Sequence, residues 1–374
     1  MPRTGYANLP LHGGTPPRWL YKRMVQLSKS IIDVMTANYN EQTVLKRLSD
    51  PYWFQSLTCV LGFDWHSSGT TTVSCAALKE AINQMNTRLS MAGGKGKASQ
   101  LALQEIDSHG HKYNFSTKKI QSLQKASRLT AKVDNTALQD GYSLYHHSMI
   151  LIQAGYWSVI QQGINTEEGY ARRYHWTSEN LESYITTPHQ AILGNQHQQT
   201  LNMISKQSIT TQQISVDLIC DHPSHLRSDW AQIARPKNQM TLHKWMSPST
   251  KQHIPPSLNM PRTINWEKMK ELYDFQPKNY EELLSIKGVG PKTIRALALI
   301  SELIYGHAPS WEDPVKYTFT VGGKDGVPYP VDCRTMDQTT QILNQAIRQA
   351  KIGDKQQIKA IERLKKITPP CQSH

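Results

Sequence analysis

The sequence has few cysteines, and their spacing excludes the common cysteine-bound sites. The five cysteines lie far apart, at Cys59, Cys75, Cys220, Cys333 and Cys371, and no C-x-x-C pair occurs. A zinc knuckle or a cysteine-held cluster is therefore not expected, and a reduced, cytoplasmic protein is predicted. Long apolar runs are missing too, because none approaches the roughly 18 residues of a membrane span. Residues 1–17 lack the apolar core of a secretory signal.

Acidic residues are scarce relative to basic ones. Lys and Arg total 42 against 29 Asp and Glu, which gives a formal charge of +13 and an isoelectric point near 9.4. A chain this basic attracts polyanions in a salt-dependent way, so its charge favours a nucleic-acid partner. Without an apolar span, a membrane is not expected as a partner. The length of 374 residues suffices for two or three domains.

The sequence does contain a glycine corner between two helical runs, LLSIKGVGPKTIRALALI at residues 283–300. Two glycines permit a tight turn there, and the positive end of the helix that follows can hold a phosphate oxygen. The pattern resembles the helix-hairpin-helix motif of DNA-repair and recombination proteins. Such a motif grips the backbone without reading bases. The resemblance implies that four corner residues bind nucleic acid: Gly288, Gly290, Lys292 and Thr293. The alternative is an ordinary helix–turn–helix.

The order of patterns predicts an α+β fold that is mostly helical. A mixed N-terminal domain with a β-hairpin is expected over 1–235, where apolar runs flank Gln153–Tyr156. It is expected to be the catalytic domain. A proline-rich linker is predicted over 236–262. An all-α helix-hairpin-helix domain, ending in a basic helix, is predicted over 263–374.

Apolar spacing predicts further helices. They are expected from Arg18 to about Leu48, from Ser74 onward, over 116–147 in two pieces, and over roughly 337–366. Residues 91–98, MAGGKGKA, are expected to form a flexible loop. The basic residues of the last helix indicate either a solvated face or a second surface for the nucleic-acid backbone.

Two polar segments contain the residue types of a metal-dependent active site. The first is the turn DWHSSGT at 64–70, and the second is AKVDNTALQDGYSLYHH at 131–147. On a helix, Asp140 and His147 would share a face but lie about 10.5 Å apart. A metal would therefore need a ligand from elsewhere, such as Asp64 or His66. Hydrolysis of a phosphodiester with bound Mg²⁺ or Mn²⁺ is possible with these groups. The alternatives are a capped turn and a buried polar helix that stabilises the fold.

Residue roles follow from that hypothesis. The catalytic residues are expected to be Asp64, His66, Lys132, Asp134, Asp140 and His147. The metal ligands among them are expected to be Asp64, His66, Asp140 and His147. Phosphate contacts are expected from Lys95, Lys97, Lys132, Arg172, Arg173 and Lys324. Arg172 and Arg173 precede the aromatic run Tyr174–Trp176, a mix that suits a flipped or single-stranded nucleotide or else plain surface packing.

A second possible chemistry uses Lys292. The string GVGPK followed by Pro330-Val331-Asp332 resembles the helix-hairpin-helix DNA glycosylases. In those enzymes a lysine after the hairpin attacks the sugar C1′, and an aspartate in a V-D segment completes the site. The resemblance implies that Lys292 and Asp332 are the catalytic residues, with the lysine as Schiff-base nucleophile. In this sequence 40 positions separate the two residues, which is more than in those enzymes.

The chain as a whole resembles domain-of-unknown-function family 763. The resemblance rests on the strings RTGYANLPLHGGTPPRWL, VLGFDWHSSGTTT, AKVDNTALQDGYSLYHH, WSVIQQGIN, ARRYHW and GGKDGVPYPVD, and runs from residue 2 to about 340. It implies a DNA-associated protein with a helix-hairpin-helix module behind a distinctive N-terminal domain. It brings no reaction with it, so chemistry must be argued from residues.

Three functions follow. The first is a DNA-repair or recombination enzyme that cuts phosphodiester bonds with a divalent metal. The second is a glycosylase or abasic-site lyase, and the third is a structure-specific DNA-binding protein without catalysis. The density of Asp, His, Gln and Arg in 131–176 favours an enzyme.

Overall fold

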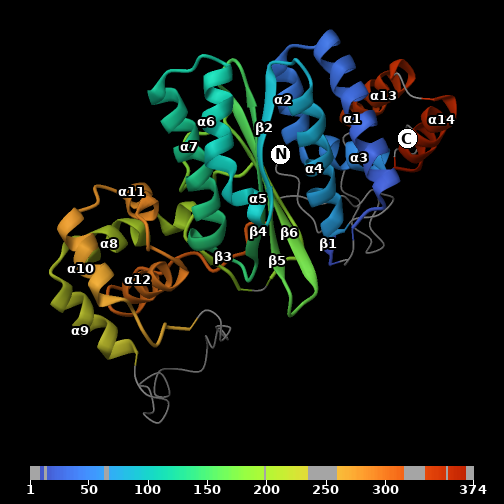
Figure 1. Ribbon diagram of the computed structural model, residues 1–374. Helices are drawn as coiled ribbons and strands as arrows, with labels where there is room; N and C mark the ends of the chain where they lie inside the picture. Colours follow the sequence, from blue (N-terminus) through green and yellow to red (C-terminus); the bar gives the residue numbers. More distant parts are fainter. Residues whose placement is uncertain are drawn as a thin grey trace.

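An antiparallel sheet of six strands separates two helical layers (Figure 1). The computed structural model describes residues 9–11, 15–62, 67–197, 199–234, 259–315, 333–350 and 353–367, without the side chains of 333–340, 355 and 365–367. The predicted α+β class, mostly helical, is confirmed. Within the described part of the chain, no helix is long and apolar enough to cross a membrane.

The sheet is built around the predicted hairpin. Its strands are β1 (Leu9–Pro10), β2 (Leu89–Lys95), β4 (Ser143–Ile152), β5 (Trp157–Asn165), β6 (Tyr170–Thr177) and β7 (Ala191–Leu193). The order is β1-β6-β5-β4-β2, with β7 also paired to β6. The register places Met149 opposite Val159, and Gly155 takes the positive φ of 85° in the turn. The hairpin is therefore confirmed, and it is longer than the apolar runs indicated.

One face of the sheet packs against the N-terminal helices. They are α1 (Arg18–Asn38), α2 (Glu41–Ser49), α3 (Pro51–Leu61) and α4 (Ser68–Gln84). The predicted helix over 18–48 is broken because Asn40 caps α2, accepting from the Thr43 N–H at 2.8 Å. Asp50 caps α3 in the same way, with Pro51 in the first turn. Helix α4 begins at Ser68, earlier than the predicted Ser74.

The other face packs against helices from the middle of the chain. They are α5 (Lys97–Gln100), α6 (Ala102–Lys112) and α7 (Thr117–Lys132), followed by the π-helical turn η1 (Val133–Ala137). A small sheet of β3 (Leu138–Gln139) and β8 (Leu201–Asn202) follows. The turn η2 (Lys206–Ser208) and five more helices complete this side: α8 (Ile209–Cys220), α9 (Pro223–Ile233), α10 (Trp266–Phe275), α11 (Tyr280–Ser285) and α12 (Pro291–Leu303).

The C-terminal helices do not join α10–α12. The predicted basic helix is two helices, α13 (Cys333–Gln349) and α14 (Asp354–Ile367). Leu343, Ile347 and Leu364 are buried in the core formed with α1–α4, on the opposite side of the sheet (Figure 1). The predicted single domain over 263–374 is thus split between two cores. Most of the predicted linker, 235–258, lies outside the described residues.

Two local predictions were wrong, each for its own physical reason. Residues 138–147 were expected to be helical, and 91–98 were expected to be a loop, yet β4 and β2 pair there. Glycine is needed at position 93 of this pairing, because an added Cβ would lie 2.1 Å from the carbonyl oxygen of His147. The polar side chains of β4 are buried on both faces, so the strand lacks the apolar alternation by which strands are recognised.

Candidate nucleic-acid interface and the buried polar centre

Helices α11 and α12 meet in a tight turn, Ile286–Thr293, which we call the corner. Val289 is 1% exposed and fixes the turn to the core, and its N–H donates to the Ile286 carbonyl at 3.3 Å. Gly288 has a φ of +94°, and an added Cβ there would lie 2.8 Å from Cε of Lys268. Glycine is therefore required at 288. Gly290 is extended, with open space where a Cβ would point.

Several main-chain donors of the corner have no acceptor in the part of the chain that the structure describes. No side chain caps α12. Among the described residues, nothing accepts from the N–H groups of Lys287, Gly290, Lys292 or Thr293. Lys287 and Lys292 are exposed, while Gly290 and Thr293 are partly exposed. Free N–H groups at a helix N-terminus carry partial positive charge, so this surface suits an anion.

Two side chains, one from the last residue of α7 and one from the segment that follows it, hold the corner from beneath. The Lys132 ammonium donates to the carbonyl oxygens of Val289 and Ile286, the latter at 3.4 Å. Gln139 donates to the Pro291 carbonyl at 2.8 Å. The structure thus places Lys132 in contact with the corner. The sequence did not predict this contact. Burial, and then the nearby Lys268, lower the pKa of Lys132.

Beneath the sheet lies a cluster of six side chains, Ser127, Asp134, His147, Gln161, Trp176 and His189, which we call the buried polar centre. None is more than 6% exposed. The Asp134 carboxylate accepts from Gln161 at 2.6 Å, from Trp176 at 2.9 Å and from His189 at 2.5 Å. Asp134 therefore has its hydrogen-bonding capacity used inside the protein.

The chain of bonds also sets the tautomer of His147. The Gln161 amide nitrogen donates to Asp134, so its oxygen must accept from Nδ1 of His147, at 2.9 Å. Nε2 of His147 then accepts from the Ser127 hydroxyl at 2.8 Å. Burial lowers the pKa of His147, which matches this neutral form. A serine–histidine pair of this kind can activate a nucleophile, yet both residues are enclosed.

Asp140 belongs to a separate buried cluster. The Arg172 guanidinium donates to Asp140 at 2.8 Å and to Asp313 at 2.7 Å, and so bridges the two carboxylates. The Tyr174 hydroxyl also donates to Asp140. Both side chains of the Arg172–Asp140 pair are fully buried. Burial raises the pKa of Asp140 against the opposing effects of Arg172 and Tyr174. Removing one partner of such a pair is costly, so Asp140 has a structural role here.

The two neighbouring arginines do not form one phosphate clamp. Successive strand residues point to opposite faces, so Arg172 faces the α7 side and Arg173 faces α3 and α4, where Gln55 accepts at 3.1 Å. Both are 0% exposed, and the predicted exposed phosphate surface is wrong for this reason. Burial lowers the pKa of Arg173 to about 10. His146 and His175 lie on that same face of the sheet and are also buried.

The predicted metal site is not assembled by the residues that can be placed. Asp64 and His66 lie outside the described residues, while Asp140 and His147 belong to different hydrogen-bonded clusters. In the described ranges no three His, Cys, Asp or Glu side chains are grouped to hold an ion. Metal-dependent cutting stays a prediction.

The other predicted site residues are separated. Lys95 ends β2 with its ammonium 5.8 Å from the Tyr145 ring centroid, and Lys97 is exposed at the start of α5. Lys292 is exposed in the corner, but Asp332 and Lys324 lie outside the described residues. The pairing of Lys292 with Asp332 therefore stays a prediction.

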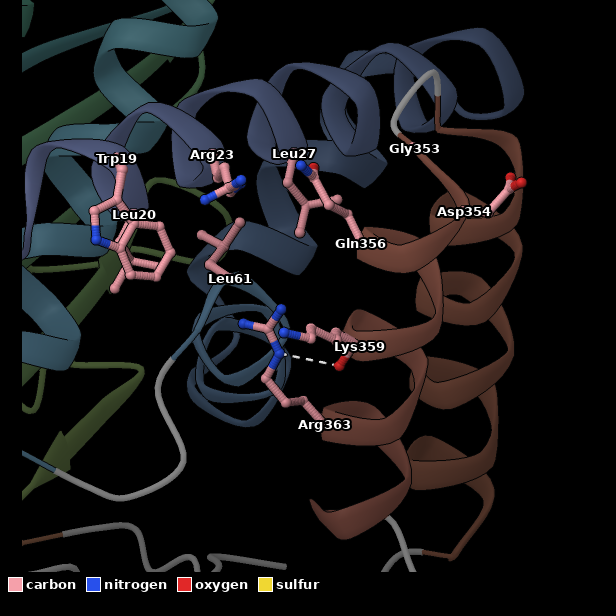
Figure 2. A pocket seen from close by; sticks show the side chains of 10 residues that line it. All are labelled: Trp19, Leu20, Arg23, Leu27, Leu61, Gly353, Asp354, Gln356, Lys359 and Arg363. Atoms are coloured by element: carbon pink, nitrogen blue, oxygen red, sulfur yellow. Dashed lines mark hydrogen bonds between the residues drawn. The ribbon is translucent and has the colours of Figure 1, made fainter.

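A basic groove of about 700 Å³ lies on the far side of the sheet, between α1, the end of α3 and α14 (Figure 2). The Arg23 guanidinium lies 5.1 Å from the ring centroid of Trp19, which is 60% exposed. From α14, Lys359 and Arg363 line the groove, with Asp354 as its acidic member. Arg363 donates to the Lys359 carbonyl at 3.1 Å. The second backbone surface expected on the C-terminal helix would lie here, apart from the corner.

The arrangement is that of an α+β protein whose buried polar centre is internally bonded and whose glycine corner is exposed. The chain belongs to the DUF763 family, described as proteins of unknown function, whose family model matches residues 5–331. The expected family is thus confirmed, and α13 and α14 lie beyond the matched region. Searches among curated proteins and among solved structures found no match.

Sequence reasoning missed several members of these clusters. His189 and Asp313 are bonded to residues 55 and 141 positions away, respectively. Lys268 was also missed, although its stem covers Gly288. No local pattern marks such residues, because their roles come from contacts that only the folded chain makes.

Proposed function

We propose that this protein binds the sugar-phosphate backbone of DNA through the corner. The observation that carries the proposal is the set of main-chain N–H groups at Lys287, Gly290, Lys292 and Thr293, which have no partners in the described residues. A phosphate oxygen can accept from such donors, and the helix dipole of α12 favours its charge.

The charges around the corner favour the same ligand. Lys287 and Lys292 are exposed on it. Arg128, one turn before Lys132 on α7, is also exposed and shares its helix face. The nearby Glu281 is engaged by Lys125 at 2.7 Å. The surplus of positive charge attracts a polyanion and adds salt dependence to binding.

Binding of this kind reads no sequence. Main-chain N–H groups and lysines contact phosphates, which are the same at every base pair. We therefore expect similar affinity for unrelated sequences, and affinity that falls as salt rises.

Fluorescence anisotropy with labelled DNA tests the proposal. Two duplexes of unrelated sequence, their single strands and a duplex RNA are titrated at salt concentrations between about 50 and 200 mM. The expected result is equal affinity for the two duplexes within about twofold, and a linear fall of log affinity with log salt. Absence of binding at the lowest salt would overturn the proposal. Adding Mg²⁺ or Mn²⁺ to the same mixtures tests the predicted cutting.

A further inference from the structure

The contact between Lys132 and the corner suggests more than a support. A trans peptide holds its C=O and the next residue's N–H on opposite sides, and the described backbone has no cis peptide bond. Lys132 draws the carbonyls of Ile286 and Val289 inward. The N–H groups in the same two peptide planes, those of Lys287 and Gly290, must then point outward.

We propose that Lys132 is the positioning residue of the phosphate site. Its ammonium fixes two peptide planes so that the Lys287 and Gly290 N–H groups face a backbone phosphate. This inference rests on the proposed function. Lys132 is the last residue of α7 and is half-buried, so it sets the corner from below without touching the ligand.

The surrounding contacts strengthen this assignment. The turn itself supplies only one bond to the Ile286 carbonyl, from the Val289 N–H at 3.3 Å. A carbonyl oxygen can accept two hydrogen bonds. Lys132 supplies the second bond to the Ile286 carbonyl and a charged donor to the Val289 carbonyl. Gln139 from the same segment restrains the first turn of α12 through Pro291. The corner is therefore oriented by a segment about 150 positions earlier in the chain, as the sequence separations of 154 and 157 show.

Three variants separate positioning from simple charge. Lys132→Met removes both the donor and the charge, and Lys132→Gln keeps an N–H donor without charge. Lys118→Met is the matched control, because it removes an exposed lysine from the first turn of the same helix, whereas Lys132 is the last residue of that helix. Circular dichroism and thermal unfolding establish that each variant folds.

The readout is DNA affinity measured against salt, by the same anisotropy assay. Lys132→Met is expected to weaken binding by about tenfold, since bonds to charged donors and acceptors contribute this much. The slope of log affinity against log salt should stay unchanged, because Lys132 contacts no phosphate. Lys132→Gln should recover part of the loss, and Lys118→Met should change affinity by less than about twofold.

Two results would overturn the inference. One is wild-type affinity in Lys132→Met. The other is a slope reduced by about 0.9 with no recovery in Lys132→Gln, which indicates a direct phosphate contact. If wild type binds and Gly290→Asp weakens binding while Lys132→Met does not, only the role of Lys132 fails. If wild type ignores DNA, the proposed function itself fails.

Discussion

The corner and the buried polar centre are both rich in polar groups, yet they use them in opposite ways. In the centre, Asp134 accepts three hydrogen bonds from protein donors at 0% exposure. In the corner, the N–H groups of Gly290 and Thr293 find no acceptor in the described chain. The difference teaches that a density of catalytic residue types says little by itself. Hydrogen-bonding capacity that is left over for a ligand is the better guide to a site.

The two regions are joined by a short segment. Lys132 contacts the corner, and Asp134, two residues later, anchors the centre. Between them the chain leaves α7 and enters η1, a π-helical turn. Such turns redirect side chains and are frequent at functional sites. Here the turn lets one segment serve the interior and the surface.

The largest expected effect is loss of stability in Asp134→Ala. Three buried donors would lose their acceptor, at about 1–3 kcal/mol each, so a loss of about 4 kcal/mol in the free energy of unfolding is expected. Chemical denaturation measures it. Asp33→Ala, at an exposed position of α1, is the control and should change stability by less than about 0.5 kcal/mol. A stable Asp134→Ala protein would contradict the structural role.

Next in size is Gly290→Asp. The site has room for the side chain, and aspartate is a good N-cap that would itself accept from the α12 N–H groups. Stability should therefore hold, while DNA affinity falls about thirtyfold through competition and repulsion. Anisotropy and thermal unfolding on one sample measure both.

Gly353→Asp provides the matched comparison. Gly353 precedes α14, also with open space around it. It should leave affinity within about twofold if the corner is the principal contact. An equal loss in Gly353→Asp would move the contact to the basic groove of Figure 2.

A smaller effect concerns pH. Burial lowers the pKa of His146 to about 3. Below pH 6.5 this side chain therefore binds a proton in the unfolded chain but stays neutral in the folded protein. The contribution of His146 to the free energy of unfolding is therefore complete above pH 6.5 and is lost as the pH falls. The loss is about 1 kcal/mol between pH 7 and 5.5. Denaturation across pH measures the slope. His146→Gln should reduce this slope without abolishing it, because burial also lowers the pKa of His147 and His175. His307→Gln, at an exposed position, should leave it unchanged.

The smallest expected effect is that of Lys292→Ala. The side chain is exposed, so stability should not change. Loss of one phosphate contact should weaken DNA binding about threefold and reduce the salt slope by about 0.9. Anisotropy across salt concentrations measures both. An unchanged slope would mean that Lys292 points away from bound DNA.

The sequence predicted features that local rules control. The β4–β5 hairpin and the α11–α12 turn follow from apolar runs around glycine, and the structure confirms both elements. It did not predict that Arg172 and Arg173 face opposite sides of a buried strand. Residue type suggested a charged surface, and only the fold supplies the partners, such as Asp313, that keep such charges inside.

The long reach of Lys132 and Gln139 bears on how the protein can be divided. A fragment that covers only 259–315 contains the whole corner in sequence but lacks both side chains that orient it. Helix α12 also packs against α8, outside that fragment. The corner is thus not a transplantable module: cut out and grafted elsewhere, it would keep its glycines and lose its geometry.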